Sequence, residues 1–205
     1  MKRALLVFFA SVLGLSAFAE GTTIVDDWAG VQAPPAPVLS PVRADPAATA
    51  LLLLDFEART VGSRPRALAT LPRVKALLER ARAAKVLVVY STTAAGSPET
   101  ILPELKSLPE EHVVKSGVDK FFGTDLEAYL KGKGIGQVII AGIVAEGAVL
   151  GTSIGASIRG FKVIVPVDGT ASSEMYAEQY VAWHLANAPG VRGNVVLTRT
   201  DLISF

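Results

Sequence analysis

From residue 50 onward, short apolar runs alternate with segments of helical periodicity. The continuous apolar runs, which we interpret as strands, are residues 51–54, 86–90, 138–141, 163–165 and 195–197. The predicted helices are residues 71–84, a segment ending near Leu130, and residues 149–159 and 177–185. Apolar strands that are separated by helices have no solvent-facing side, which indicates a parallel sheet covered on both faces. We therefore predict an α/β fold, a three-layer α/β/α sandwich with a mostly parallel doubly wound sheet.

The N-terminal segment has the features of a secretory signal peptide. Lys2 and Arg3 precede an apolar run at residues 4–15, which the small-residue pattern Ala-Phe-Ala follows at residues 17–19. The run is short for a membrane span, which takes about 20 apolar residues, so we prefer cleavage over an uncleaved anchor. We predict a signal peptide at 1–19, a proline-rich N-terminal arm at 20–49 and one domain at 50–205, in a periplasmic or secreted protein.

Composition narrows the function further. The chain has 205 residues, half of them apolar, which suits one well-packed domain. Its net charge of +1 becomes −1 when Lys2 and Arg3 are removed with the signal, so no nucleic-acid partner and no stable membrane association are expected. There is no cysteine, and the two histidines, His112 and His184, are far apart in the sequence. We predict no metal and no cofactor.

Candidate polar residues follow the predicted strands. Ligands of open parallel sheets bind beyond the carboxyl ends of the strands. Asp55 follows the first strand, Ser91 follows the second, and a glycine turn begins at Gly142 after the strand at 138–141. An aspartate at a strand end is also a common turn residue. The assignment of Asp55 to a functional site therefore needs further support.

That support comes from three segments taken together. The segments are LLLLDF at residues 51–56, VVKSGVDKFFGTDL at 113–126 and QVIIAGIVAEGAVLGTSIGASIRGFKVIVPVDGTAS at 137–172. Together they resemble the signature blocks of the isochorismatase-like (cysteine hydrolase) superfamily. The resemblance covers nearly all of residues 50–205 and implies the same fold. It implies that Asp55 and Lys115 are the catalytic aspartate and lysine. Phe122, or Phe121 with it, falls where the family has an aromatic residue.

The resemblance also implies an oxyanion hole at the glycine turn. A cis peptide bond would fall between Ile143 and Val144, and the N–H donors would be those of Val144 and Ala148. The family's nucleophilic cysteine would stand at position 148, where this chain has an alanine. A covalent acyl intermediate at that position is therefore excluded. True isochorismatases also lack the cysteine, and in them the aspartate is thought to act as an acid. The chain shares Ala145 with those enzymes but has Glu146 where they have a histidine.

Three other ionisable residues are candidates, and two of them also have a simpler explanation. Glu146 could supply a second acid or contact the substrate, but a carboxylate at a helix start also interacts favourably with the helix dipole. Glu57, where many relatives have a glutamine, would raise the pKa of Asp55 if the two lie close. Arg66, together with Arg59 and Arg64, could bind a substrate carboxylate or belong to a solvated loop.

These observations leave alternative functions open. The first is an exported hydrolase that acts on a small, anionic metabolite by acid–base chemistry without a cysteine nucleophile. The second is a catalytically inactive relative that serves as a small-molecule binding module. A third is an assembly role as a homo-oligomer. Retention of both Asp55 and Lys115 favours the first, because an ion pair is costly to bury without a use.

Overall fold

The computed structural model describes residues 22–205, so the predicted signal peptide at 1–19 lies outside the described residues. The described chain divides after Pro35 into two units, the second of which comprises residues 36–205. In the first unit, the described residues include a 3₁₀ turn, η1, at Trp28–Gly30. None of the described helices is both long and apolar enough to cross a membrane.

The second unit is built on a parallel sheet with the strand order β4-β3-β2-β5-β6-β8. The strands are β2 (Thr49–Leu54), β3 (Leu87–Thr92), β4 (His112–Lys115), β5 (Gln137–Ile143), β6 (Lys162–Pro166) and β8 (Val195–Thr198). A short strand, β7 (Thr170–Ala171), pairs with the end of β5. All of these pairings are parallel, so the predicted fold class is confirmed.

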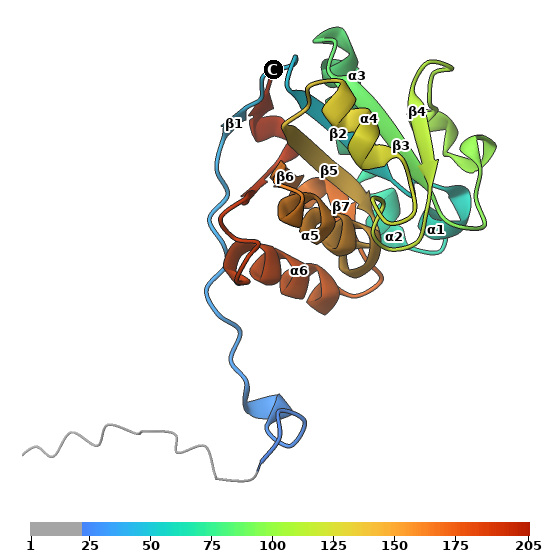
Figure 1. The fold of residues 1–205 in the computed structure, drawn as a ribbon. Coiled ribbons are helices and arrows are strands. Elements are labelled where there is room, and N and C mark those ends of the chain that lie inside the picture. The colour runs from blue at the N-terminus through green and yellow to red at the C-terminus, as the bar shows by residue number, and fades with distance from the viewer. Residues whose placement is uncertain (1–21) are drawn as a thin grey trace, which may run out of the picture. The chain divides into compact units, whose positions relative to one another are not determined.

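Helices cover both faces of this sheet, as Figure 1 shows. Successive side chains of β2 alternate between two buried clusters, because neighbouring residues of a strand point to opposite faces. Leu52 and Leu54 pack on the side of α4 (Leu126–Gly132), α5 (Leu150–Ile158) and α6 (Met175–Asn187). Leu51 and Leu53 pack on the side of α3 (Leu71–Ala83). The remaining helices, α1 (Ala58–Val61) and α2 (Pro65–Leu68), follow β2 directly.

The element boundaries differ from the sequence prediction in two places. The helix expected to begin at residue 149 begins with one π-helical turn, η4 (Ala145–Val149), which continues into α5. The compact unit begins at Ala36 rather than at residue 50. Within residues 36–49, β1 (Val42–Arg43) pairs with β9 (Ile203–Ser204), and Ala44 is buried. Pairing with a distant segment is not visible in the local proline-rich composition.

The strand order determines where a site can form. The chain runs outward from β2 to β3 and β4, then returns to place β5 against the other edge of β2. The order in which the chain adds strands therefore reverses between β2 and β5. Such a switch point leaves a crevice at the carboxyl ends of the strands. Leu54 pairs with Gly142, so Asp55 and the turn at Ile143–Val144 lie at the two sides of this crevice.

Candidate active site

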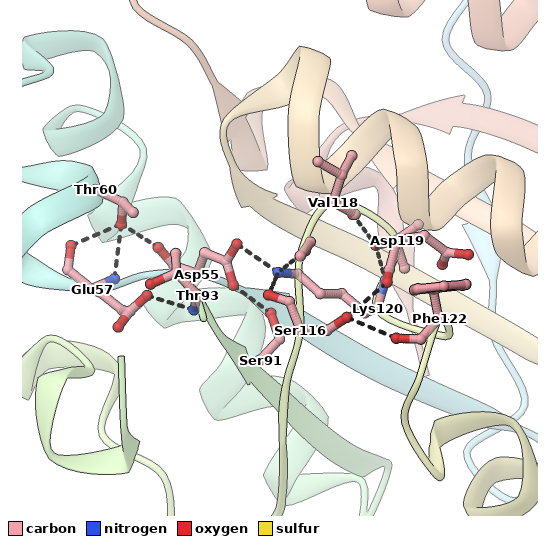
Figure 2. Close-up of polar contacts among 12 residues, drawn as sticks. Asp55, Glu57, Thr60, Ser91, Thr93, Ser116, Val118, Asp119, Lys120 and Phe122 are labelled. Atoms are coloured by element: carbon pink, nitrogen blue, oxygen red, sulfur yellow. Dashed lines mark hydrogen bonds and ion pairs between the residues drawn. The ribbon is translucent and has the colours of Figure 1, made fainter. Parts of the chain in front are cut away.

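Asp55 is the central polar residue at the switch point. Its backbone lies in the left-handed region with φ +55°, which aspartate tolerates better than most residues. One carboxylate oxygen, Oδ1, accepts a hydrogen bond of 2.7 Å from the Ser91 hydroxyl, and Oδ2 accepts one of 2.7 Å from Lys120 Nζ (Figure 2). The residue is 5% exposed. Both oxygens are thus held in place by donors from two other segments.

Lys120 is completely buried and pairs with Asp55. Besides the carboxylate, its ammonium group donates to the backbone carbonyl oxygens of Gly117 at 2.7 Å and Ser116 at 3.3 Å. Three acceptors match the three N–H donors of a lysine. The charge of Lys120 is therefore both neutralised and fully hydrogen-bonded, as a buried charge requires.

The lysine beside Asp55 is Lys120, so the placement of Lys115 at this position is wrong. Lys115 ends β4 as the resemblance implies, but β4 is the edge strand and β3 separates it from β2. Two strand spacings of about 4.8 Å put the end of β4 about 10 Å from that of β2. Lys115 is also exposed. The loop at residues 116–119 turns back from the sheet edge and carries Lys120 to Asp55.

Glycines in α5 let the loop at residues 116–119 lie close to this helix. A Cβ atom on Gly151 would lie 2.6 Å from a side-chain carbon of Val118, and one on Gly155 would lie 2.4 Å from an Asp119 carboxylate oxygen. Between them, the Thr152 hydroxyl accepts a hydrogen bond from the Lys120 N–H at 3.2 Å and donates one to the Val118 carbonyl at 3.3 Å. Gly151 and Gly155 therefore form a contact face for the loop at residues 116–119.

Burial raises the pKa of Asp55 above its ordinary value of 3.8. Hydrogen bonding and charge attraction from Lys120, and the Ser91 hydroxyl, lower the pKa and offset part of that effect. The nearby Glu57 carboxylate raises the pKa further, in the direction that the sequence predicts. A carboxyl whose pKa moves towards neutral pH is suited to proton transfer in either direction.

A cavity of about 260 Å³ opens beside Asp55. Val144 and Ala148 line it, so the turn after β5 forms the wall opposite the aspartate. The Ile143–Val144 peptide bond is cis, at the position that the resemblance implies. The remaining lining residues are Thr60, Arg64, Thr93, Ala94, Ser116, Gly117, Val118, Ile143 and Gly147.

Five of the predicted site residues, Lys115 among them, do not line this cavity. Phe122 is 79% exposed, whereas its neighbour Phe121, the other candidate for the family's aromatic position, is buried and stacks on Phe161. Arg66 lies at the surface and is paired with Glu178 at 2.5 Å. The cavity arginine is Arg64 instead.

The two glutamates are occupied elsewhere. Glu146 is exposed, and its carboxylate accepts a hydrogen bond of 2.8 Å from the Ser172 hydroxyl. Glu57 is buried, and its carboxylate accepts hydrogen bonds from the Thr93 N–H at 2.8 Å and the Thr100 hydroxyl at 2.5 Å. The Glu57 carboxylate therefore fixes the loop after β3, and it influences the Asp55 carboxyl group through its charge. Among the described residues, no group of three or more side chains is arranged to hold a metal ion.

The comparisons with known proteins agree with this geometry. The isochorismatase domain model matches residues 49–201, and the chain belongs to the isochorismatase family. Two sequences named streptothricin hydrolase, both from Streptomyces noursei, are 33% and 32% identical to it over 141 and 180 residues. Those matches cover 62% and 82% of this chain but 51% and 65% of the relatives, so the chain spans about half to two thirds of their length.

Solved structures show the same fold. An isochorismatase-like hydrolase from Alkaliphilus metalliredigens has a TM-score of 0.68 at 25% identity, over 76% of this chain and 96% of the other. A nicotinamidase from Staphylococcus aureus has a TM-score of 0.66 at 21% identity, over 75% and 99% of the two chains. At that identity the second match speaks for the fold alone.

Sequence reasoning missed Lys120 and did not single out Arg64. The lysine motif contains two lysines, and the resemblance points to Lys115, the one that ends a strand. The two lysines lie five residues apart in one motif, and no local pattern distinguishes them. Nothing in the sequence separates Arg64 from Arg66 two residues later.

Proposed function

We propose that the domain is a hydrolase of a small, anionic metabolite that works by acid–base chemistry at Asp55, without a covalent intermediate at position 148. The observation that carries the proposal is the carboxyl group of Asp55 itself. It lines a cavity, both of its oxygens are held by donors, and its pKa is raised. Membership in a hydrolase family and similarity to sequences named streptothricin hydrolase support the reaction class.

Each residue of the site has a role in this proposal. Asp55 transfers a proton to the substrate or takes one from an attacking water, and Lys120 holds the carboxyl group in position. The backbone N–H groups of Val144 and Ala148 stabilise negative charge that develops on a substrate oxygen. The Ala148 methyl group carries no nucleophile, so water is the attacking group.

The decisive experiment replaces Asp55 by asparagine. Asparagine keeps the size of the side chain and also tolerates the left-handed backbone at this position. Turnover of a panel of vinyl ethers, esters and amides should fall by about 10²–10⁴, the usual contribution of a placed acid or base. Glu146→Gln is the matched control, since this exposed carboxylate lies off the cavity and its loss should leave turnover unchanged. Equal rates in Asp55→Asn and the native protein would contradict the proposal.

The pH profile separates the two directions of proton transfer. If Asp55 acts as an acid, turnover falls as the pH rises through its raised pKa, because the proton to be donated is lost. If it acts as a base, turnover falls as the pH decreases through the same value. A profile that is flat across the acidic and neutral range would remove Asp55 from the chemistry.

A binding module is the second candidate function, and the methyl group of Ala148 in the cavity wall favours it. Ala148→Cys places a thiol at the position of the family's nucleophile. If this variant gains amidase activity while the native protein hydrolyses none of the panel, the binding module is the better description. We also propose, from the signal at residues 1–19, that the protein is exported to the periplasm or secreted.

A further inference from the structure

The charges around the cavity do not balance. Among the described residues that line it, Asp55 and Arg64 are the charged ones. Asp55 is neutralised by Lys120 directly behind it. Arg64 makes no ion pair with any described carboxylate, so the wall of the cavity retains one positive charge.

Arg64 is nevertheless held firmly. Its Nη1 donates to the backbone carbonyl of Thr60 at 2.5 Å, and its Nε donates to the Ser173 hydroxyl at 3.0 Å. These partners come from α1 and from the segment before α6, so the guanidinium is fixed from two sides. Both acceptors are neutral and leave its charge uncompensated. A guanidinium has five N–H donors, of which these bonds use two.

Arg66 differs from Arg64 because its charge is paired with a carboxylate. Its Nε and Nη2 both donate to the carboxylate of Glu178, at 2.8 and 2.5 Å, so its charge already has a partner. It also lies outside the wall of the Asp55 cavity. A fork that faces a cavity without a carboxylate partner is the arrangement that binds an incoming carboxylate in two-point fashion.

Thr60 connects this arginine to the catalytic aspartate. Its carbonyl accepts from Arg64, and its hydroxyl donates to the backbone carbonyl of Asp55. The separation between the guanidinium and the Asp55 carboxyl is therefore set by one short segment of chain. A substrate whose charged group is bound at Arg64 would present its scissile bond at a fixed distance from Asp55.

We infer that Arg64 is the specificity-determining residue of this site and that it binds the carboxylate of a small substrate. The inference rests on the proposed function for the position of the scissile bond. Ala94, Val118 and Val144 give the rest of the cavity an apolar lining, and its volume of about 260 Å³ is small. The substrate class is therefore a small monocarboxylate with an apolar body that carries the bond to be hydrolysed.

The test measures binding and is independent of turnover. Benzoate and benzamide have nearly the same shape and differ in charge, and their affinities are measured by calorimetry or ligand-observed NMR. The native protein should prefer benzoate, and Arg64→Gln should weaken benzoate binding by about 10- to 100-fold while leaving benzamide unchanged. Arg64→Lys keeps the positive charge but not the forked guanidinium, so its benzoate affinity should lie between those of the native protein and Arg64→Gln. Arg66→Gln changes the net charge equally and is the matched control.

Three outcomes would overturn the inference. They are no benzoate binding by the native protein, equal affinity for benzoate and benzamide, and equal benzoate affinity in Arg64→Gln and Arg66→Gln. The fate of the proposed function is read separately from hydrolysis. If the native protein hydrolyses nothing but loses its benzoate preference in Arg64→Gln, the carboxylate site stands and the hydrolase proposal fails.

Discussion

Replacing Lys120 by methionine tests the buried ion pair on which the site depends. Methionine keeps most of the length and apolar volume of the side chain but removes its charge. Asp55 would then be left 5% exposed with Ser91 as its remaining donor. Removing one partner of a buried pair costs about 3–5 kcal/mol, because the other charge stays buried without compensation. For a domain of this size each kcal/mol lowers Tm by roughly 2–4 °C, so a decrease of about 6–20 °C is expected.

The loss of stability should depend on pH in a defined direction. The pKa of Asp55 is raised in the folded protein, so its contribution to stability is complete below the ordinary value of 3.8 and is lost as the pH rises through the folded-state value. Lys120 lowers this pKa, and its removal raises the pKa further. The difference in unfolding free energy between Lys120→Met and the native protein should therefore grow as the pH rises from 4 (about the ordinary pKa of an aspartate) towards neutrality.

Lys115→Met is the matched control, because the two lysines lie in one motif and Lys115 is exposed. It should change stability by less than about 0.5 kcal/mol. Chemical denaturation at several pH values measures both variants. Adding Asp55→Asn to Lys120→Met should recover about 0.5–3 kcal/mol, since it removes the stranded charge. Equal effects of the two lysine variants, or a larger effect of Lys115→Met, would refute the assignment of Lys120 to the site.

Three further predictions test the surroundings of the site and the export of the chain. Gly142→Ala should lower the unfolding free energy by about 1–3 kcal/mol, because its Cβ would lie 2.6 Å from Cβ of Leu54, while Gly136→Ala, which has open space, is the control. Phe121→Ala should cost about 3–5 kcal/mol and Phe122→Ala less than about 0.5 kcal/mol in the same denaturation assay, and equal costs would contradict the side-chain assignment. Mass spectrometry of the exported protein should find Glu20 as the first residue, and a mature chain that begins at Met1 would count against signal cleavage.

Much of the fold could be predicted from local patterns. Continuous apolar runs gave the central strands, because a strand buried on both faces has no polar side to display. The apolar face of residues 71–84 gave α3, whose buried side chains are Val74, Leu77, Leu78 and Ala81. The cis bond at Ile143–Val144 and the position of Ala148 followed from the resemblance of one segment to a family block.

The residues that make up the candidate active site were harder to predict from the sequence. Two lysines share one motif, and two arginines are separated by a single residue, with no difference in periodicity between them. Asp55 follows β2 directly, as the sequence indicates, because the end of a continuous apolar run is a position that local patterns define. It misplaced the lysine, because the loop at 116–119 crosses back over the sheet edge and no local pattern records that path.

The sequence by itself determined the layered α/β fold, the aspartate at the end of the first buried strand and the absence of a thiol nucleophile. Each of these depends on residue type or on short-range periodicity, both of which can be read along the chain. The tertiary structure decided that Lys120 rather than Lys115 pairs with Asp55, that Arg64 rather than Arg66 faces the cavity, and that Glu57 and Glu146 are engaged away from it. These choices depend on strand order, on the close approach of a loop to the glycine-rich helix, and on pairing with residues more than 100 positions away, such as Arg66 with Glu178. Contacts of that kind exist only once the chain has folded.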